Sequence, residues 1–161
     1  MSTGNNASNV NTVAINGLGF REVYLILRKQ FAVNCSIGSY EKGLSIVVPM
    51  LVNGAFACEL LLKSLNPSLN RGHKLKTELF DKLKDTTKQD IINRFIVKSK
   101  NTYDETTFNS DFIKNEELFV DWRYFHEKSN HASLGFLDLL IQTLYDFMKD
   151  NNIFEDSSPD Y

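Results

Sequence analysis

The segment Leu44–Leu65, LSIVVPMLVNGAFACELLLKSL, is the most apolar part of the chain. Pro49 suits the first turn of an α-helix, where the backbone needs no N–H donor, so we expect a helix that begins near Val47 or Val48. A helix that is apolar nearly all round lies buried at the centre of a fold. Apolar side chains surround most of this helix: Val48, Leu51, Val52, Ala55, Phe56, Leu60 and Leu62.

Glu59 and Lys63 interrupt this apolar surface. They lie four residues apart with the acid first, which is the favourable order for an ion pair on a helix. A buried acid needs a partner, and the planar guanidinium of an arginine satisfies a carboxylate best. The sequence leaves two partners open for Glu59, namely Lys63 on the same helix and Arg123 from across the core.

Apolar residues at helical spacing recur on both sides of this central segment. They predict helices over about 18–35, 72–83, 108–127 and 134–149. A further helix is predicted to begin at an N-cap formed by Thr86 and Thr87. No stretch alternates between apolar and polar residues as a half-buried strand does. The sequence therefore predicts an all-α, up-and-down helical bundle of four to five main helices.

The chain length predicts one domain, over residues 18–150, because 161 residues can bury one sizeable core. Residues 1–17 are polar and Asn-rich, and they are expected to form a flexible arm. Residues 151–161 are acidic and Ser-rich, and they are expected to form a tail that frays.

The composition, 42% hydrophobic and 24% charged, is ordinary for a soluble globular protein. The formal net charge of −2 argues against a strongly basic nucleic-acid surface, although 18 Lys and Arg residues permit a local basic groove. We expect no membrane span, because Pro49, Asn53, Gly54 and Glu59 break the most apolar run. The N-terminus lacks the pattern of a signal peptide.

Cys35 and Cys58 both lie among apolar residues at helical positions. They are expected to be reduced core residues rather than a disulfide pair, which predicts a cytoplasmic protein.

The segment Phe119–His131, FVDWRYFHEKSNH, holds the only Trp and two of the three His residues. On a helix, Phe119, Trp122 and His126 share one face. One interpretation places Trp122 in the core and pairs Arg123 with an acid. The other places Arg123 and a histidine in a polar site for phosphate or RNA.

His73 stands at the start of the short helix predicted over 72–83, where it would cap the helix or point into a cleft. The lysines that follow it form a modest basic run that is either solvated or in contact with RNA. The sequence has no Gly-rich phosphate loop and no Cys cluster, and His126 and His131 are five residues apart rather than four. We therefore expect no metal and no cofactor.

Three segments together resemble the HEPN superfamily, in particular an uncharacterised bacterial branch of it. They are AFACELLLKSL at 55–65, GHKLKTELFDKL at 72–83 and FVDWRYFHE at 119–127. With the final apolar helix, the resemblance covers about residues 18–150.

The resemblance implies a helical bundle that often pairs as a homodimer. Many relatives are metal-independent RNases of toxin–antitoxin, phage-defence or RNA-processing systems. Their site has an Arg, a polar residue after it, and a His after about four to six intervening residues. Here Tyr124 follows Arg123, and His126 and His131 fall on either side of that spacing.

Other relatives lack the catalytic pair and bind partners, and the departures from the motif favour that role here. We expect a non-catalytic domain that binds a protein such as an antitoxin, a nucleotide or RNA. The alternative is a metal-independent endoribonuclease that uses Arg123 with His126 or His131. The expected polar cluster for binding or structure consists of Glu59, His73, Trp122, Tyr124 and Glu127.

Overall fold

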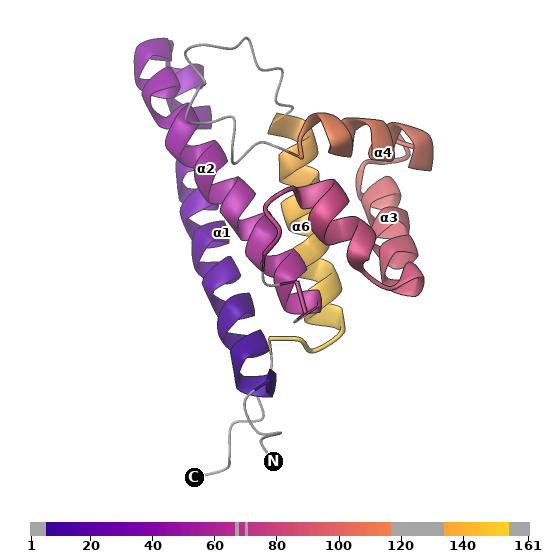
Figure 1. The fold of residues 1–161 in the computed structure, drawn as a ribbon. Coiled ribbons are helices and arrows are strands. Elements are labelled where there is room, and N and C mark those ends of the chain that lie inside the picture. The colour runs from indigo at the N-terminus through magenta and orange to yellow at the C-terminus, as the bar shows by residue number, and fades with distance from the viewer. Residues whose placement is uncertain (1–5, 67, 70, 117–133, 155–161) are drawn as a thin grey trace.

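The computed structural model describes residues 6–66, 68–69, 71–116 and 134–154, and every regular element in these ranges is helical (Figure 1). The predicted all-α bundle is confirmed. The elements are α1 (Asn6–Ser36), α2 (Tyr40–Leu65), a π-helix (Leu75–Leu79), a 3-10 helix (Phe80–Lys82), α3 (Asp85–Lys98), α4 (Glu105–Lys114) and α6 (Leu134–Asp150).

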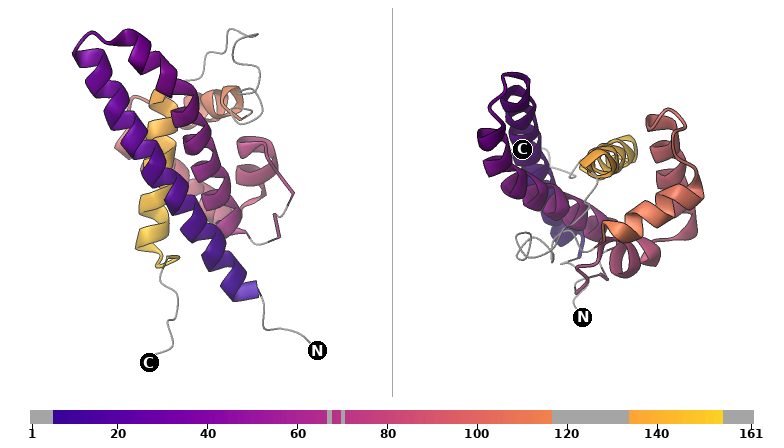
Figure 2. Two further views of the ribbon diagram at one scale, coloured as in Figure 1. Left: turned by 90° about the vertical axis from the view of Figure 1, so that its left-hand side faces the viewer. Right: turned by 90° about the horizontal axis from the view of Figure 1, so that it is seen from above.

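Helices α1 and α2 form a long antiparallel hairpin, and α6 packs along α2 (Figure 1 and Figure 2). Helices α3 and α4 lie on the other side of α6. Gly54 permits close packing at the centre, because a Cβ there would lie 2.8 Å from the Tyr24 ring of α1 and 2.9 Å from Leu137 of α6. The central position expected for the apolar segment is therefore confirmed.

A cluster of aromatic rings fills the second half of the core. Phe108 of α4 lies 4.9 Å from Phe95 of α3 and 5.9 Å from Phe136 of α6, measured between ring centroids. Phe80 and Phe112 complete the group. These rings connect the short helices to α6.

The start predicted for the first helix is wrong, because α1 begins at Asn6 rather than near residue 18. Ala14 is fully buried, and a Cβ on Gly17 would lie 3.0 Å from Leu61. These small residues let a polar segment pack closely on α2 without large apolar side chains. Residues 6–17 of the predicted arm are thus helical.

The predicted acidic tail also begins with packed residues. The N–H of Ile153 donates to the carbonyl of Met148 at 2.9 Å. Phe154 stacks on Tyr145 with 5.7 Å between ring centroids. Residues 155–161 lie outside the described part of the chain.

Three further boundaries differ from the predictions. The short helix expected over 72–83 is a π-helix followed by a 3-10 helix, although Leu75, Leu79 and Leu83 are buried as expected. Helix α3 begins at Asp85, just before the predicted threonine cap. Helix α4 ends at Lys114, and the remainder of the helix expected over 108–127 lies largely outside the described residues.

The predicted start of helix α2 is wrong, because the helix begins at Tyr40 rather than near Val47 or Val48, and Pro49 lies inside it. Its 26 residues contain a window of mean hydropathy 1.8, so by length and composition alone it could cross a membrane. In the structure α1 and α6 pack against it, and Glu59, which interrupts its apolar surface, is buried. The core helix of a folded domain passes the same test of length and composition.

The two cysteines are both free thiols but differ in burial, which gives a testable difference in reactivity. Cys35 is partly exposed, whereas Cys58 is fully buried and its burial raises the pKa of the thiol. Since the thiolate is the reactive form, iodoacetamide is expected to modify Cys35 in the folded protein and Cys58 only after unfolding. Peptide mapping by mass spectrometry measures this, and equal native labelling rates would contradict it.

Candidate functional site

The candidate site is a polar cluster of Glu59, Lys63 and His73, where the C-terminal half of α2 meets the loop before the π-helix. Glu59 Oε1 accepts a hydrogen bond from Lys63 Nζ at 2.7 Å and lies 3.1 Å from His73 Nδ1. The predicted Glu59–Lys63 pair is therefore confirmed. The cluster brings together Glu59 and His73, which are fourteen positions apart in the sequence.

The carboxylate of this polar cluster is buried, with only 3% of Glu59 exposed. Its second oxygen, Oε2, has no hydrogen-bond partner among the residues that the structure describes. By contrast, the side chain of His73 is 60% exposed. The polar cluster thus links a buried acid to an imidazole at the surface.

The loop that carries His73 is held by Gly72 and Glu78. A Cβ on Gly72 would lie 2.9 Å from Leu79 and 3.0 Å from Glu78, so only glycine lets the loop approach this closely without displacing them. Glu78 Oε2 accepts hydrogen bonds from the backbone N–H groups of His73 and Lys74, at 2.8 and 3.2 Å. These bonds lower the pKa of Glu78. The capping side chain is Glu78, while that of His73 turns to Glu59.

The π-helix fixes this loop to the end of α4. Thr77 Oγ1 and the Thr77 N–H both donate to Glu116 Oε2, at 2.7 and 3.1 Å. The N–H of Leu75 donates to the Glu116 carbonyl at 3.2 Å. π-Helical turns are rare and are frequently found at functional sites.

The contact with Glu59 fixes the chemistry of His73. When the carboxylate of Glu59 is ionised it can only accept hydrogen bonds, and the contact then places the proton of the His73 ring on Nδ1. In the neutral ring Nε2 is then the acceptor, as in other carboxylate-oriented histidines. Such an imidazole can accept a hydrogen bond or a proton from a ligand.

The basic character of this region is local. Arg71 is exposed two residues before His73, and Lys74 follows it. The longer basic run expected over Lys74–Lys88 is not a continuous basic surface, because Lys76 is buried and paired with Asp81, and Lys88 pairs with Asp85. Lys82 and Lys84, farther along the run, are also exposed, so the cations next to His73 itself are Arg71 and Lys74.

The other predicted site residues lie in 117–133, outside the described part of the chain: Trp122, Arg123, Tyr124, His126, Glu127 and His131. The alternative Glu59–Arg123 pair lies there too. Their roles stay predictions.

A partly buried contact that the sequence analysis missed connects α1 to α6. The Tyr24 hydroxyl donates to Asp138, and Arg28 Nε donates to the other carboxyl oxygen at 2.9 Å. Burial, together with Asp138, raises the pKa of the Tyr24 phenol. The available signal was the acid Asp138 inside the apolar run LGFLDLLI at the start of the final helix. All three residues are paired with one another, so we interpret them as a structural link.

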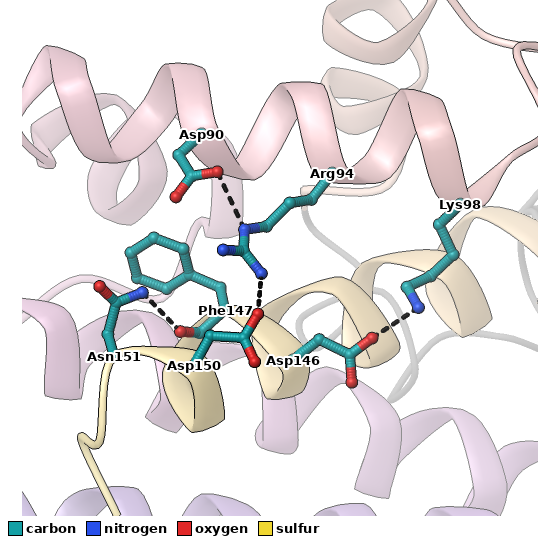
Figure 3. Close-up of polar contacts among 7 residues, drawn as sticks. All are labelled: Asp90, Arg94, Lys98, Asp146, Phe147, Asp150 and Asn151. Carbon is teal, nitrogen blue, oxygen red and sulfur yellow. Dashed lines mark hydrogen bonds and ion pairs between the residues drawn. The ribbon is translucent and has the colours of Figure 1, made fainter.

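A groove of about 520 Å³ between α3 and α6 holds another group of charged side chains (Figure 3). Arg94 of α3 bridges Asp90 and Asp150, and Lys98 Nζ lies 2.6 Å from Asp146. Because these cations are already paired with acids, the groove is a connection between helices rather than a ligand site. Among the described residues, no group of three or more His, Cys, Asp or Glu could hold a metal ion.

No family model matches this chain, and no curated protein or solved structure is significantly similar to it.

Proposed function

We propose that this chain is a HEPN-like helical domain that binds a partner through the polar cluster and the segment 71–74. The observation that carries the proposal is the 3.1 Å contact between buried Glu59 and exposed His73. A carboxylate as deeply buried as that of Glu59 is costly unless it is paired. Here it pairs with Lys63 and orients the exposed imidazole of His73. The all-α bundle, with Glu59 on the second long helix and His73 before the next helical turn, supports the HEPN-like assignment.

Among the expected partners, a nucleotide or RNA suits the site best. Arg71 and Lys74 carry positive charge on either side of His73, and arginine binds phosphate through two hydrogen bonds. The negative charge of Glu59 offsets the positive charge of Lys63. The carboxylate of Glu78 accepts hydrogen bonds from the backbone N–H groups of His73 and Lys74. The excess positive charge is small, so we expect modest affinity that falls as salt rises.

The HEPN resemblance adds a setting to this proposal. On that ground we propose that the domain works as a homodimer in a toxin–antitoxin or phage-defence system, with an antitoxin as a protein partner. The support is the order and spacing of the three segments at 55–65, 72–83 and 119–127. The reduced cysteines favour the cytoplasm.

Binding is expected to depend on His73 and Arg71. Hydrogen bonds to charged groups contribute about 1.5–3 kcal/mol, so His73→Ala and Arg71→Ala should each weaken binding by roughly tenfold or more. Fluorescence anisotropy with labelled single-stranded RNA, and competition by ATP, measures this. Lys42→Ala is the control, because it removes an exposed cation from the opposite end of α2.

The proposal fails if the folded wild-type protein binds neither probe, or if His73→Ala and Arg71→Ala bind as the Lys42→Ala control does. Circular dichroism establishes that each variant is folded.

The alternative function is a metal-independent endoribonuclease that uses Arg123 with His126 or His131. The observation in its favour is that Glu116, from which the chain enters 117–133, is bonded to the π-helix beside His73. RNA cleavage in the presence of EDTA tests it. Cleavage that is lost in a folded Arg123→Ala variant and in one of His126→Ala and His131→Ala would favour the nuclease over the binding domain.

A further inference from the structure

A cavity of about 490 Å³ lies where the end of α2, the start of α3 and the end of α6 meet. Its volume is within the usual range of ligand sites, about 300–1,000 Å³. The apolar residues that line it are Leu65, Leu83, Phe147 and Ile153, and the polar ones are Ser64, Asn66, Lys84, Thr87 and Asn151. An apolar wall with a few polar groups is typical of a cavity that binds a small organic group.

Three polar groups of this cavity are not engaged by the residues that the structure describes. Lys84 is exposed and forms no ion pair with them. The Thr87 hydroxyl has no hydrogen-bond partner in the described part of the chain. The amide nitrogen of Asn151 donates to the Phe147 carbonyl at 2.7 Å (Figure 3), which leaves its amide oxygen as an acceptor. A ligand can therefore accept hydrogen bonds from Lys84 and Thr87 and donate one to Asn151.

The charge at the wall of the cavity is positive. Among the described residues that line it, none is an Asp or Glu. Lys82, two residues before Lys84, is exposed as well, and the neighbouring acid Asp85 pairs with Lys88 at 2.8 Å. The groove between α3 and α6 differs, because acids already pair with its cations. The cavity therefore favours an uncharged ring that adjoins an anion such as a phosphate.

The cavity lies next to the polar cluster along α2. Glu59, Lys63 and Asn66 follow one another at steps of four and three residues, so they lie along one side of the end of the helix. The distance from Glu59 to Asn66 is roughly 10 Å along the helix axis, at about 1.5 Å per residue. Asn66 also holds the cavity wall in place, because its Nδ2 donates to the Lys82 carbonyl at 3.1 Å. One extended strand can therefore reach both the segment 71–74 and the cavity.

We propose that the cavity holds a base of the same single-stranded RNA that contacts the segment 71–74. The apolar wall suits the flat face of a base, and Thr87 and Asn151 suit its polar edge. The phosphate next to that base contacts Lys84. The inference rests on the proposed function for the first contact, and it selects an RNA strand over a free nucleotide as the ligand.

Affinity is expected to rise with the length of the strand, because only a strand can fill both places. Fluorescence anisotropy of a labelled hexanucleotide measures this, with AMP, UMP and the di- and tetranucleotides of adenylate and uridylate as competitors. The tetranucleotide of at least one of the two bases should bind roughly tenfold or more tightly than its mononucleotide, which is the usual effect of one stacked base.

Thr87→Trp is expected to fill the cavity with a ring of the protein itself. It should remove most of the gain in affinity with length and leave the affinity for AMP and UMP within a few-fold of wild type. Gln89→Trp is the matched control, because Gln89 is exposed on the same helix and does not line the cavity. Lys84→Ala removes an exposed side chain, so it should not disturb the fold, and it should weaken tetranucleotide binding several-fold with little effect on the mononucleotides.

Two results would overturn the cavity assignment. The first is a tetranucleotide that binds no more tightly than its mononucleotide, and the second is a gain with length that Lys84→Ala and a folded Thr87→Trp both retain. If Thr87→Trp does not fold, Lys84→Ala decides. In either case mononucleotide binding that depends on His73 would leave the proposed function standing.

Failure of the proposed function gives a different pattern. A strand whose affinity depends on Thr87 and Lys84, but not on His73 and Arg71, would refute the site at 71–74 and support the cavity. A folded wild-type protein that binds no strand would refute both.

Discussion

Phe108→Ala is expected to lower the free energy of unfolding by about 3–5 kcal/mol, the usual range for a buried Phe cut to Ala. Phe108 is fully buried, and its ring lies 4.9 Å from Phe95, 5.5 Å from Phe112 and 5.7 Å from Phe80. No single neighbour can fill the space, because each ring is held by the others. Urea unfolding followed by circular dichroism measures the change.

The matched control for this variant is Ile113→Ala on the same helix. Ile113 is 54% exposed, so its truncation should change stability by less than about 1 kcal/mol. If the two variants destabilise the protein equally, the aromatic cluster does not hold α3, α4 and α6 together as described.

Glu59→Ala is expected to lower the free energy of unfolding by about 3 kcal/mol. Removing one partner of a buried ion pair costs about 3–5 kcal/mol, and the lower end applies because Lys63 and His73 both retain access to water. Glu59→Gln keeps the volume and one acceptor and should cost less. Urea unfolding measures both variants, with exposed Glu41→Ala on the same helix as the control.

The double variant Glu59→Leu/Lys63→Met separates stability from function at this site. Replacing both members of a buried ion pair with apolar residues is often neutral or stabilising, so this variant should be about as stable as wild type. It should lose ligand binding, because His73 loses the carboxylate that orients it. A stable double variant that binds like wild type would show that Glu59 does not serve the site.

The helices with strong apolar periodicity were predictable from the sequence. The final helix, expected over 134–149, spans Leu134–Asp150. The start of α1 was not predictable from the sequence. Ala14 and Gly17 pack against α2 because they are small, and they do not belong to a repeated pattern of large apolar residues. Side-chain spacing reports large apolar residues and misses close packing of small ones.

The candidate site was predictable only in part. Lys63 follows Glu59 by one helical turn, so their pair could be inferred from spacing. The contact between Glu59 and His73 depends on a loop that Gly72 lets approach the π-helix, and on Glu78 binding its backbone. Both are tertiary features, and the sequence left His73 with two roles, a cap of the helix or a side chain that points into a cleft.

The most direct test of the proposed binding site is an NMR titration of ¹⁵N-labelled protein with single-stranded RNA or ATP. The structure predicts the largest shift changes at the backbone amides of 71–77 and at the imidazole nitrogens of His73, with small changes along α1. The largest changes at the groove between α3 and α6, or no change at saturating ligand, would contradict the assignment of the polar cluster as the binding site.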